Sequence, residues 1–331
     1  MLETIPFSLL ELASVREHST IRETLQNSLC YAQAAERLGF NRFWLAEHHN
    51  MEGIASSATA VLIGYIAGGT TTLRVGSGGI MLPNHPPLVI AEQFGTLACL
   101  YPGRIDLGLG RAPGTDPITS RALRRDGLAA EEFPTEVNLL QQLLAPAHPD
   151  QRLKAIPGAG TEVPIWLLGS SLFSAQLAAK RGLPYAFAGH FAPRLMRDAL
   201  RIYRSQFVPS ANLEKPYAML GMPVIVADTG EEAAHLATTS HQRILALLRG
   251  HPLWLKPPVE TMEGHWNIEE ELNVKDFLAL AAVGSQSEVK TKLEQLAAEL
   301  GIDEFMFTID VYDPQKRLRA LELLADMKAK Q

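Results

Sequence analysis

Short apolar segments alternate with longer segments of helical periodicity along almost the whole chain. The apolar segments have the length of strands and are set off by Pro, Gly or polar turns, whereas the segments between them repeat their apolar positions as helices do. We expect strands at Ile5–Leu12, Asn41–Glu47, Leu73–Leu82, Arg104–Gly110, Val163–Leu168, Pro184–Ala188, Ala218–Ala227 and Glu304–Asp310. This alternation, without repeats or a Ser/Gly-rich linker, favours an α/β fold: one (β/α)8 TIM barrel over residues 1–331, with insertions after strands four and seven. A doubly wound open sheet is the alternative, but no G-x-G-x-x-G sequence opens the first helix.

The helical segments carry recognisable ends. Thr20 can cap the first helix, and Gly39 follows it as a C-terminal glycine. We expect helices at Ile21–Leu38, Ala58–Ala67, Glu131–Leu144, Pro193–Phe207, Glu231–Leu248, Ser287–Leu300 and Gln315–Lys328.

The helix at Ala58–Ala67 is apolar on nearly every face. Such a helix needs cover on its outer side as well as its inner side, which indicates an interface with a second copy of the chain, a homodimer. A local insertion that covers the helix is the alternative.

Two long irregular segments interrupt the alternation. Residues 112–162 and 250–276 lie between expected strands of one barrel. Segments of this length between barrel strands are commonly active-site loops, so we expect both to be lids.

Glycines gather in the third and fourth expected strands, at Gly76, Gly78, Gly79, Gly108 and Gly110. Glycine weakens a strand, so several together suggest that another surface comes very close to the backbone. Arg111 follows directly, where the end of a strand would present it to a ligand. One hypothesis is a flat ligand over bare backbone with its anionic end held by Arg111; the alternative is a barrel interior with room for small side chains alone.

Two further polar groups lie at strand ends, where a barrel places its active site. Glu47, His48 and His49 end the second strand, and one of the histidines could act as a general base near neutral pH. Adjacent residues of a strand point to opposite faces, so His48 and His49 should not share a metal ion, and we expect no metal site. The alternative is a buried histidine that hydrogen bonds to the neighbouring carboxylate.

The second group is Gly169, Ser170 and Ser171, followed by Ser174, between the fifth strand and a helix. Free backbone N–H groups at a helix start, together with hydroxyl donors, form an anion site. Arg111 ends the neighbouring strand and could bind the same anion. Read as helix caps alone, the serines need no ligand.

Composition and charge narrow the function further. The chain has 331 residues, of which 47% are hydrophobic and 20% charged, and its net charge is −6 without a long basic run. This argues against nucleic acid or an anionic membrane as the main partner. Cys30 and Cys99 lie within helical patterns, and we expect two buried thiols in a reducing compartment. With no signal-peptide pattern at the N-terminus, we expect a cytoplasmic protein.

The residues quoted above resemble those of the bacterial luciferase-like flavin monooxygenase family, in its single-gene, FMN-using branch. The segments that carry the resemblance are Phe43–His49, Val75–Pro83, Gly103–Arg111 and Trp166–Ser171, and the similarity covers almost the whole chain in order. The family fold is a (β/α)8 barrel. One departure is Gly110, where luciferase has a cysteine before the arginine.

The resemblance implies roles for individual residues. His48, beside Glu47, would act as the acid/base near the flavin. The strand-three peptide Gly78–Gly79, which in this family is often a non-prolyl cis bond, would support the isoalloxazine ring, with Ser77 beside it. Arg111, Gly169, Ser170, Ser171 and Ser174 would form the site of the FMN phosphate.

The function implied is a monooxygenase that uses reduced FMN and O2 on a small organic substrate, with the reduced flavin supplied by a separate NAD(P)H:flavin reductase. One alternative is hydride transfer with the deazaflavin F420 on the same fold, whose longer tail would need positive charge such as Arg121, Arg124 and Arg125. Another is a flavin-binding protein without turnover.

Overall fold

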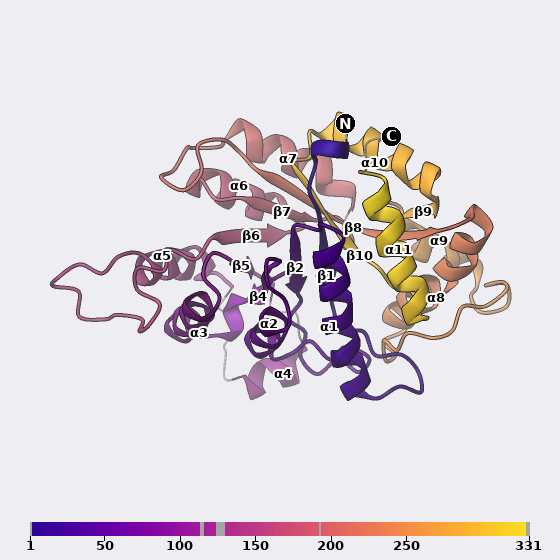
Figure 1. Cartoon of the computed structure of the whole chain (residues 1–331), viewed down its shortest axis with the longest axis horizontal. Helices are drawn as coiled ribbons and strands as arrows, with labels where there is room; N and C mark the ends of the chain where they lie inside the picture. The colour runs from indigo at the N-terminus through magenta and orange to yellow at the C-terminus, as the bar shows by residue number, and fades with distance from the viewer. Residues whose placement is uncertain (1, 113–115, 124–129, 192, 329–331) are drawn as a thin grey trace.

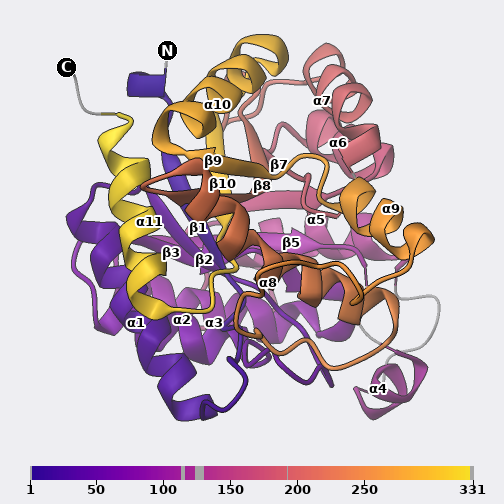
Figure 2. The same ribbon diagram turned by 90° about the vertical axis from the view of Figure 1, so that its right-hand side faces the viewer.

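Parallel strands close into a barrel that helices surround (Figure 1, Figure 2). The structure is a computed structural model that describes residues 2–112, 116–123, 130–191 and 193–328. The closed 8-strand barrel runs in the order β10-β1-β2-β3-β5-β6-β7-β8, and β8 pairs with β10 to close it. Its strands are β1 (Phe7–Glu11), β2 (Arg42–Leu45), β3 (Arg74–Ser77), β5 (Ile105–Gly110), β6 (Ile165–Gly169), β7 (Tyr185–Ala188), β8 (Ala218–Ala227) and β10 (Glu304–Thr308). The predicted TIM barrel is therefore confirmed.

The third expected strand is broken, which corrects the prediction of one continuous strand. β3 ends at Ser77, and a two-residue strand, β4 (Ile80–Met81), resumes after a cis peptide bond between Gly78 and Gly79. Both pieces pair with β5, so the barrel wall continues across the break.

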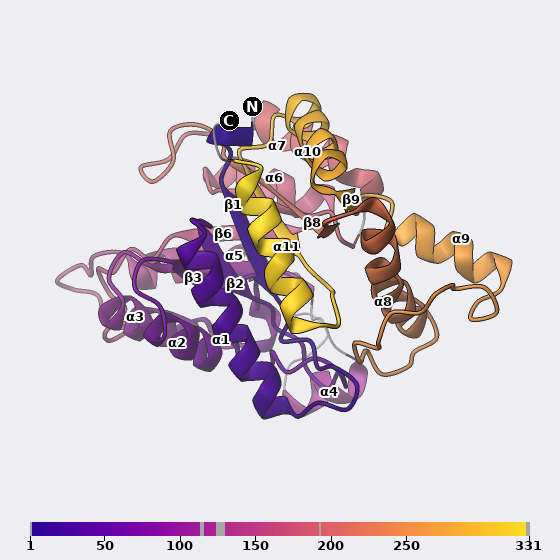
Figure 3. The ribbon, with the colours of Figure 1, turned by 45° about the vertical axis from the view of Figure 1, so that its right-hand side comes forward.

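The helices follow the strands in the expected order. In chain order they are α1 (Ile21–Arg37), α2 (Thr59–Gly68), α3 (Pro87–Leu100), α4 (Pro117–Ala122), α5 (Phe133–Leu144), α6 (Leu172–Arg181), α7 (Met196–Ser205), α8 (Gly230–Leu248), α9 (Ile268–Phe277), α10 (Gln286–Leu300) and α11 (Pro314–Asp326). Thr20 caps α1 in a capping box with Glu23, as its position before an apolar helix predicts. Figure 3 shows α1 and α11 side by side along the outside of β1 and β2.

The two expected lid segments contain secondary structure of their own. The first holds α4 and α5, and residues 113–115 and 124–129 within it lie outside the described part of the chain. The second holds α9, which packs on α8. A short strand after it, β9 (Ala282–Ser285), pairs with the second half of β8 and was not expected from the sequence.

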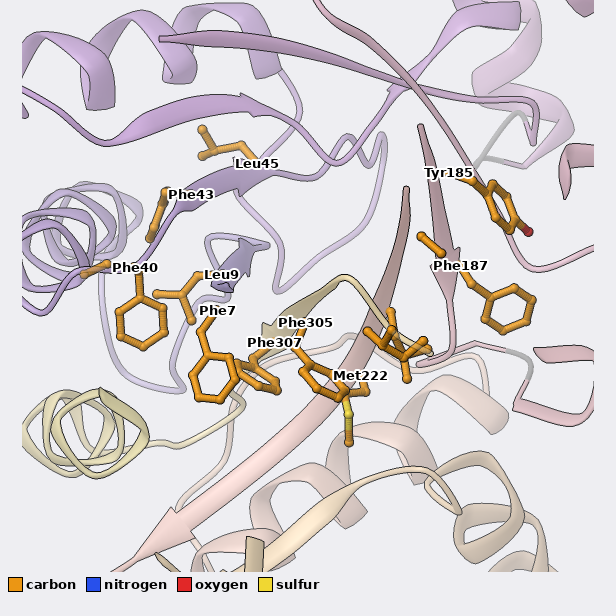
Figure 4. Close-up of a cluster of buried hydrophobic side chains, with 14 of the residues drawn as sticks. Phe7, Leu9, Phe40, Phe43, Leu45, Tyr185, Phe187, Met222, Phe305 and Phe307 are labelled. Carbon is orange, nitrogen blue, oxygen red and sulfur yellow. The ribbon is translucent and has the colours of Figure 1, made fainter. Parts of the chain in front are cut away.

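The core has two layers, because successive residues of each strand face alternately outward and inward. The outer layer lies between strands and helices, and Figure 4 shows Phe7, Phe305 and Phe307 packed together in it. The inner layer fills the barrel with Leu10, Trp44, Ala46, Trp166, Ala186, Met219 and Met306.

Buried ion pairs close the amino-terminal end of the barrel. Arg42 contacts both Asp106, at 2.6 Å, and Glu304, at 3.1 Å, and Arg74 contacts Asp106 from the next strand. Both carboxylates are fully buried. The charges are mutually paired, as buried charges must be, and they lie at the end opposite the candidate site.

The outer surface of α2 is apolar, as expected: Val61 is 71% exposed and Tyr65 43%. The expected burial of the cysteines is wrong, because Cys30 and Cys99 are both free and exposed. They do lie in helices, α1 and α3, but on the outward faces. None of the helices in the described ranges is long and apolar enough to cross a membrane.

Candidate active site

Two cavities open at the carboxyl ends of the barrel strands. The larger, which we call the strand-end cleft, encloses about 1000 Å³ including the part open to solvent. Its floor is the inner core, at Leu10, Met219 and Met306, and its walls come from the ends of β3 to β8. Barrels of this fold bind their ligands at this end of the strands.

One wall of the strand-end cleft is bare backbone, at Gly78, Gly79 and Gly110. A Cβ atom at Gly78 would lie 2.5 Å from Leu10 Cδ1, and one at Gly110 would lie 2.9 Å from Met81 Sδ. Leu10 and Met81 both line the cleft, so a side chain at either glycine would displace one of these lining residues.

Gly76 and Gly108 are needed for a different reason. A Cβ at Gly76 would lie 2.5 Å from the Asp106 carbonyl oxygen, and one at Gly108 would lie 2.1 Å from that of Ser77. Strand packing inside the barrel therefore requires Gly76 and Gly108, as the alternative of a tight barrel interior predicts. A Cβ at Gly79 would likewise lie 2.7 Å from the Gly108 carbonyl oxygen, so packing also constrains Gly79, although its backbone lines the cleft.

Ser77 is also placed differently from its expected role. Its side chain is fully buried, donates to the Gly108 carbonyl oxygen at 2.8 Å and accepts from the Gly108 N–H at 2.9 Å. Ser77 holds β3 against β5 behind the wall of the cleft and is not among the residues that line it.

Arg111 and the start of α6 lie side by side on the wall of the cleft, as the neighbouring strands predict. β5 and β6 pair in register from Leu107↔Ile165 to Gly110↔Leu168, so Arg111 and Gly169–Ser171 emerge side by side. Ser171 is the N-cap residue of α6, but its side chain makes no capping hydrogen bond. The guanidinium of Arg111 lies 4.2 Å from the centre of the Phe173 ring. The hydroxyl groups of Ser170 and Ser171, a helix N-terminus and an arginine together fit a phosphate group.

Ser174 supports this wall rather than standing free. It donates to the Ser171 carbonyl oxygen at 2.9 Å and lies 3.3 Å from the Tyr185 hydroxyl. A Cβ at Gly169 would lie 2.3 Å from Ser174 Oγ, so glycine is needed at 169 for this packing.

The second cavity, which we call the side cavity, lies between the barrel and α8. It shares His190 and Phe191 with the strand-end cleft. Its lining is mostly apolar, with His48, Arg243 and Asp310 among its polar residues. His48 therefore faces a cavity, whereas Glu47 bonds to His49; the histidine that satisfies the adjacent carboxylate is His49, not His48.

Two histidines of the side cavity are held neutral. Burial, together with the charge of Arg243, lowers the pKa of His48 to about 4, and burial lowers the pKa of His190 to about 4. His48 Nδ1 has no hydrogen-bond partner among the described residues. His190 follows the end of β7, and its ring lines both cavities. Neutral imidazoles beside a cavity can accept a proton from a ligand.

Glu47 lies behind these cavities and joins three segments. Its Oε1 lies 2.8 Å from His49 Nε2 and 2.7 Å from His85 Nε2, and its Oε2 accepts from the Met81 N–H at 3.1 Å. Burial raises the pKa of Glu47, but the hydrogen bonds from His49, His85 and Met81 outweigh it and lower the pKa below its ordinary value.

The same three side chains, Glu47, His49 and His85, are also a possible set of metal ligands, within 4.8 Å of one another. Each histidine nitrogen lies within 2.8 Å of one carboxylate oxygen. Ligand atoms about 2.0–2.2 Å from a shared ion stand roughly 3 Å or more apart, so these contacts have the geometry of hydrogen bonds. We therefore interpret the cluster as a hydrogen-bonded support for β4.

The fold is a (β/α)8 barrel, and both cavities lie at the carboxyl ends of its strands, which is where barrels of this class place their active sites. Residues 5–304 match the profile of the luciferase-like monooxygenases, and the chain belongs to that family.

Relatives cover nearly all of the chain. The uncharacterised protein YvbT of Bacillus subtilis (strain 168) is 54% identical over 321 residues, which are 97% of this chain and 96% of that protein. A protein named luciferase-like monooxygenase from Escherichia coli (strain K12) is 51% identical over 327 residues, 98% of each chain. The N-acetyl-S-alkylcysteine monooxygenase of Bacillus subtilis (strain 168) is 31% identical over 330 residues, 97% of this chain and 98% of that protein.

Solved structures share the fold over nearly the whole chain. Apo-MsnO8 superposes with a TM-score of 0.86 at 34% identity and covers 98% of both chains. At 18% identity, the oxygenating constituent of 3,6-diketocamphane monooxygenase from Pseudomonas putida, in complex with FMN, has a TM-score of 0.72 with 98% of both chains covered. At 14%, an F420-dependent tetrahydromethanopterin reductase from Methanopyrus kandleri has a TM-score of 0.68, also with 98% of both covered. At these identities, the last two similarities show a shared fold and nothing more.

Proposed function

We propose that this protein is a flavin-dependent monooxygenase that uses reduced FMN and O2 on a small organic substrate. The observation that carries the proposal is the strand-end cleft, where the bare backbone of Gly78, Gly79 and Gly110 stands beside Arg111 and the N-terminus of α6. The family supports an oxidoreductase, and the name of the N-acetyl-S-alkylcysteine monooxygenase supports a small organic substrate.

The residues present fit FMN. Gly78–Gly79 and Gly110 would lie against the flat ring, and Arg111 with Ser170 and Ser171 would bind the phosphate. When bound, reduced FMN would supply the reaction with O2. His48, which stays uncharged near neutral pH, would accept a proton from the ligand at a ring nitrogen, and the apolar lining of the side cavity would exclude water.

We propose two partners. A separate NAD(P)H:flavin reductase would deliver the reduced flavin, because the sequence has no dinucleotide fingerprint at its first helix. A second copy of the chain would cover α2, whose sequence TAVLIGYIAG has no charged residue and whose outer surface is exposed in the single chain.

The experiment that tests the proposed reaction mixes the protein, loaded anaerobically with reduced FMN, with O2 and follows the flavin spectrum. We expect bound reduced flavin to reoxidise more slowly than free reduced FMN measured beside it. His48→Ala should leave FMN affinity within a few-fold but shorten this lifetime, whereas His148→Ala, at an exposed position, should not.

Two results would contradict the proposal. Reoxidation at the rate of free FMN, with all of the oxygen recovered as peroxide, would indicate a flavin carrier. Failure to bind reduced FMN while reduced F420 binds would indicate hydride transfer; Arg121, one arginine considered for that cofactor, is described, whereas Arg124 and Arg125 lie outside the described residues.

A further inference from the structure

The side cavity has one charged end. Of the residues that line it, Arg243 and Asp310 carry the ionic groups, and they lie together. Arg243 Nη1 donates to Asp310 Oδ1 at 2.6 Å and to Ser14 Oγ at 2.8 Å. The rest of the lining is largely aliphatic and aromatic, including Leu12, Met51, Ile54 and Phe277.

Arg243 is buried, but only one of its three nitrogen atoms makes a hydrogen bond to the described residues. Its exposed fraction is 4%, and Nη1 makes both of its hydrogen bonds. Nε and Nη2 bond to none of the residues that the structure describes, although Arg243 lines the cavity. A guanidinium presents these two N–H groups as a flat edge that matches a carboxylate. An anionic group in the cavity would pair with this edge through two charged hydrogen bonds, so the edge favours such a ligand.

The ion pair of the side cavity is neutral overall, because Asp310 accepts from Nη1 of Arg243. The hydrogen-bonding edge of Arg243, and not a net charge, therefore favours an anion over a cation. The positive charge of Arg243 reaches the ring of His48 on the same cavity and helps to hold it neutral. A neutral His48 adds no competing positive charge, which leaves the free edge of Arg243 as the place for an anion.

We propose that Arg243 is a substrate-binding residue and that the substrate carries a carboxylate at one end of an apolar body. The proposal rests on the proposed function, because it takes the side cavity as the substrate site of the flavin cleft. The carboxylate binds the Nε–Nη2 edge of Arg243, and the apolar body fills the cavity. The reacting end reaches the strand-end cleft past His190 and Phe191, which both cavities share.

The test is binding of a matched set of eight-carbon probes, measured by calorimetry on the whole protein with and without oxidised FMN. Octanoate, 1-octanol and octylamine share the apolar chain and differ in the head group. We expect octanoate to bind about 10- to 100-fold more tightly than 1-octanol, as a charged hydrogen-bonded pair implies. Because no turnover is needed, a failure of the cofactor proposal in the FMN titration is separate from a failure here.

Variants assign the preference to Arg243. Arg243→Gln combined with Asp310→Asn removes both charges and leaves no unpaired one, so it should abolish the preference for octanoate while 1-octanol binds as before. Arg249→Gln is the matched control, because Arg249 lies at the end of the same helix and pairs at the surface with Glu270. Arg249→Gln should leave the affinities of all three probes unchanged.

Several results would overturn the proposal. They are equal binding of the three probes, preference for octylamine, no binding of octanoate, or a preference that survives in the double variant. The comparison of probes on the unaltered protein still tests whether the cavity prefers a carboxylate, even if the double variant does not fold.

Discussion

The carboxylate of Glu47 lies 2.7 Å from Nε2 of His85, although 38 residues separate them. The same carboxylate accepts from the Met81 N–H, so it ties the end of β2 to β4 and to the turn η2 (Leu82–Asn84) that precedes His85. Gly79, whose backbone lines the strand-end cleft, directly precedes β4. Glu47 is therefore a positioning residue for the backbone that we propose to lie against the flavin.

Glu47→Gln should destabilise this support. We expect the free energy of unfolding to fall by about 1–3 kcal/mol, because the N–H groups of His49, His85 and Met81 lose a charged acceptor. FMN affinity should fall several-fold, as measured by fluorescence titration beside urea unfolding. Glu52→Gln is the control, because Glu52 is exposed. Unchanged stability and FMN affinity would show that the hydrogen bonds of Glu47 do not position β4.

Arg111→Ala should weaken FMN binding by about 1.5–3 kcal/mol, the contribution of a hydrogen bond between charged groups. Riboflavin, which lacks the phosphate, should bind the variant as it binds the unaltered protein. Both are measured by equilibrium titration, with Arg121→Ala, in the neighbouring helix α4, as control. Equal losses for FMN and riboflavin would place the effect elsewhere than at the phosphate.

The lowered pKa values of His48 and His190 make stability depend on pH. Both groups have a pKa of about 4 in the folded protein against an ordinary value of 6.5, so the unfolded chain binds more protons in that interval. The full stability is present above pH 6.5 and is lost as the pH falls towards 4.

Urea unfolding at pH 7.5 and pH 5.0 measures this loss, and His48→Gln should reduce it. The exposed His148, replaced in the same way, should not. The same loss in His48→Gln as in the unaltered protein would mean that His48 is not held neutral by its surroundings.

Val61→Asp tests the proposed homodimer. Val61 is 71% exposed on α2, and an aspartate there would have to be buried in the interface. Light scattering after gel filtration should show a dimer for the unaltered protein and a monomer for the variant. Leu272→Asp, at an exposed apolar position on α9, should remain a dimer. A monomeric unaltered protein, or a variant that stays dimeric, would contradict the assignment.

The sequence predicts those parts of the site that depend on strand order. Arg111 and Ser170–Ser171 could be placed together because they end consecutive strands, and β5 and β6 do pair. The alternation of apolar strands and helices favoured the barrel over a doubly wound open sheet, and the closed sheet confirms it. Gly78–Gly79 could be singled out as unusual, but the packing between strands that requires glycine at positions 76, 79 and 108 could be recognised only from the distances between strands.

The contacts that the sequence does not reveal join residues far apart along the chain. His85 reaches Glu47 through the break in the third strand, and Arg243 meets Asp310 across 67 residues. Neither His85 nor Arg243 stands in a motif of its own, although an arginine within the buried face of α8 is a signal that could have been used. The exposure of Cys30 depends on which face of α1 turns outward, where the apolar pattern left room for either answer.

The central claim is that the strand-end cleft binds FMN through its phosphate. The most direct test is an equilibrium titration of the purified protein with FMN, riboflavin and F420, each oxidised and reduced. We predict that reduced FMN binds, that it binds at least about tenfold more tightly than reduced riboflavin, in line with a charged hydrogen bond, and that F420 binds more weakly than FMN. Equal affinity for FMN and riboflavin, or a preference for F420, would contradict the account.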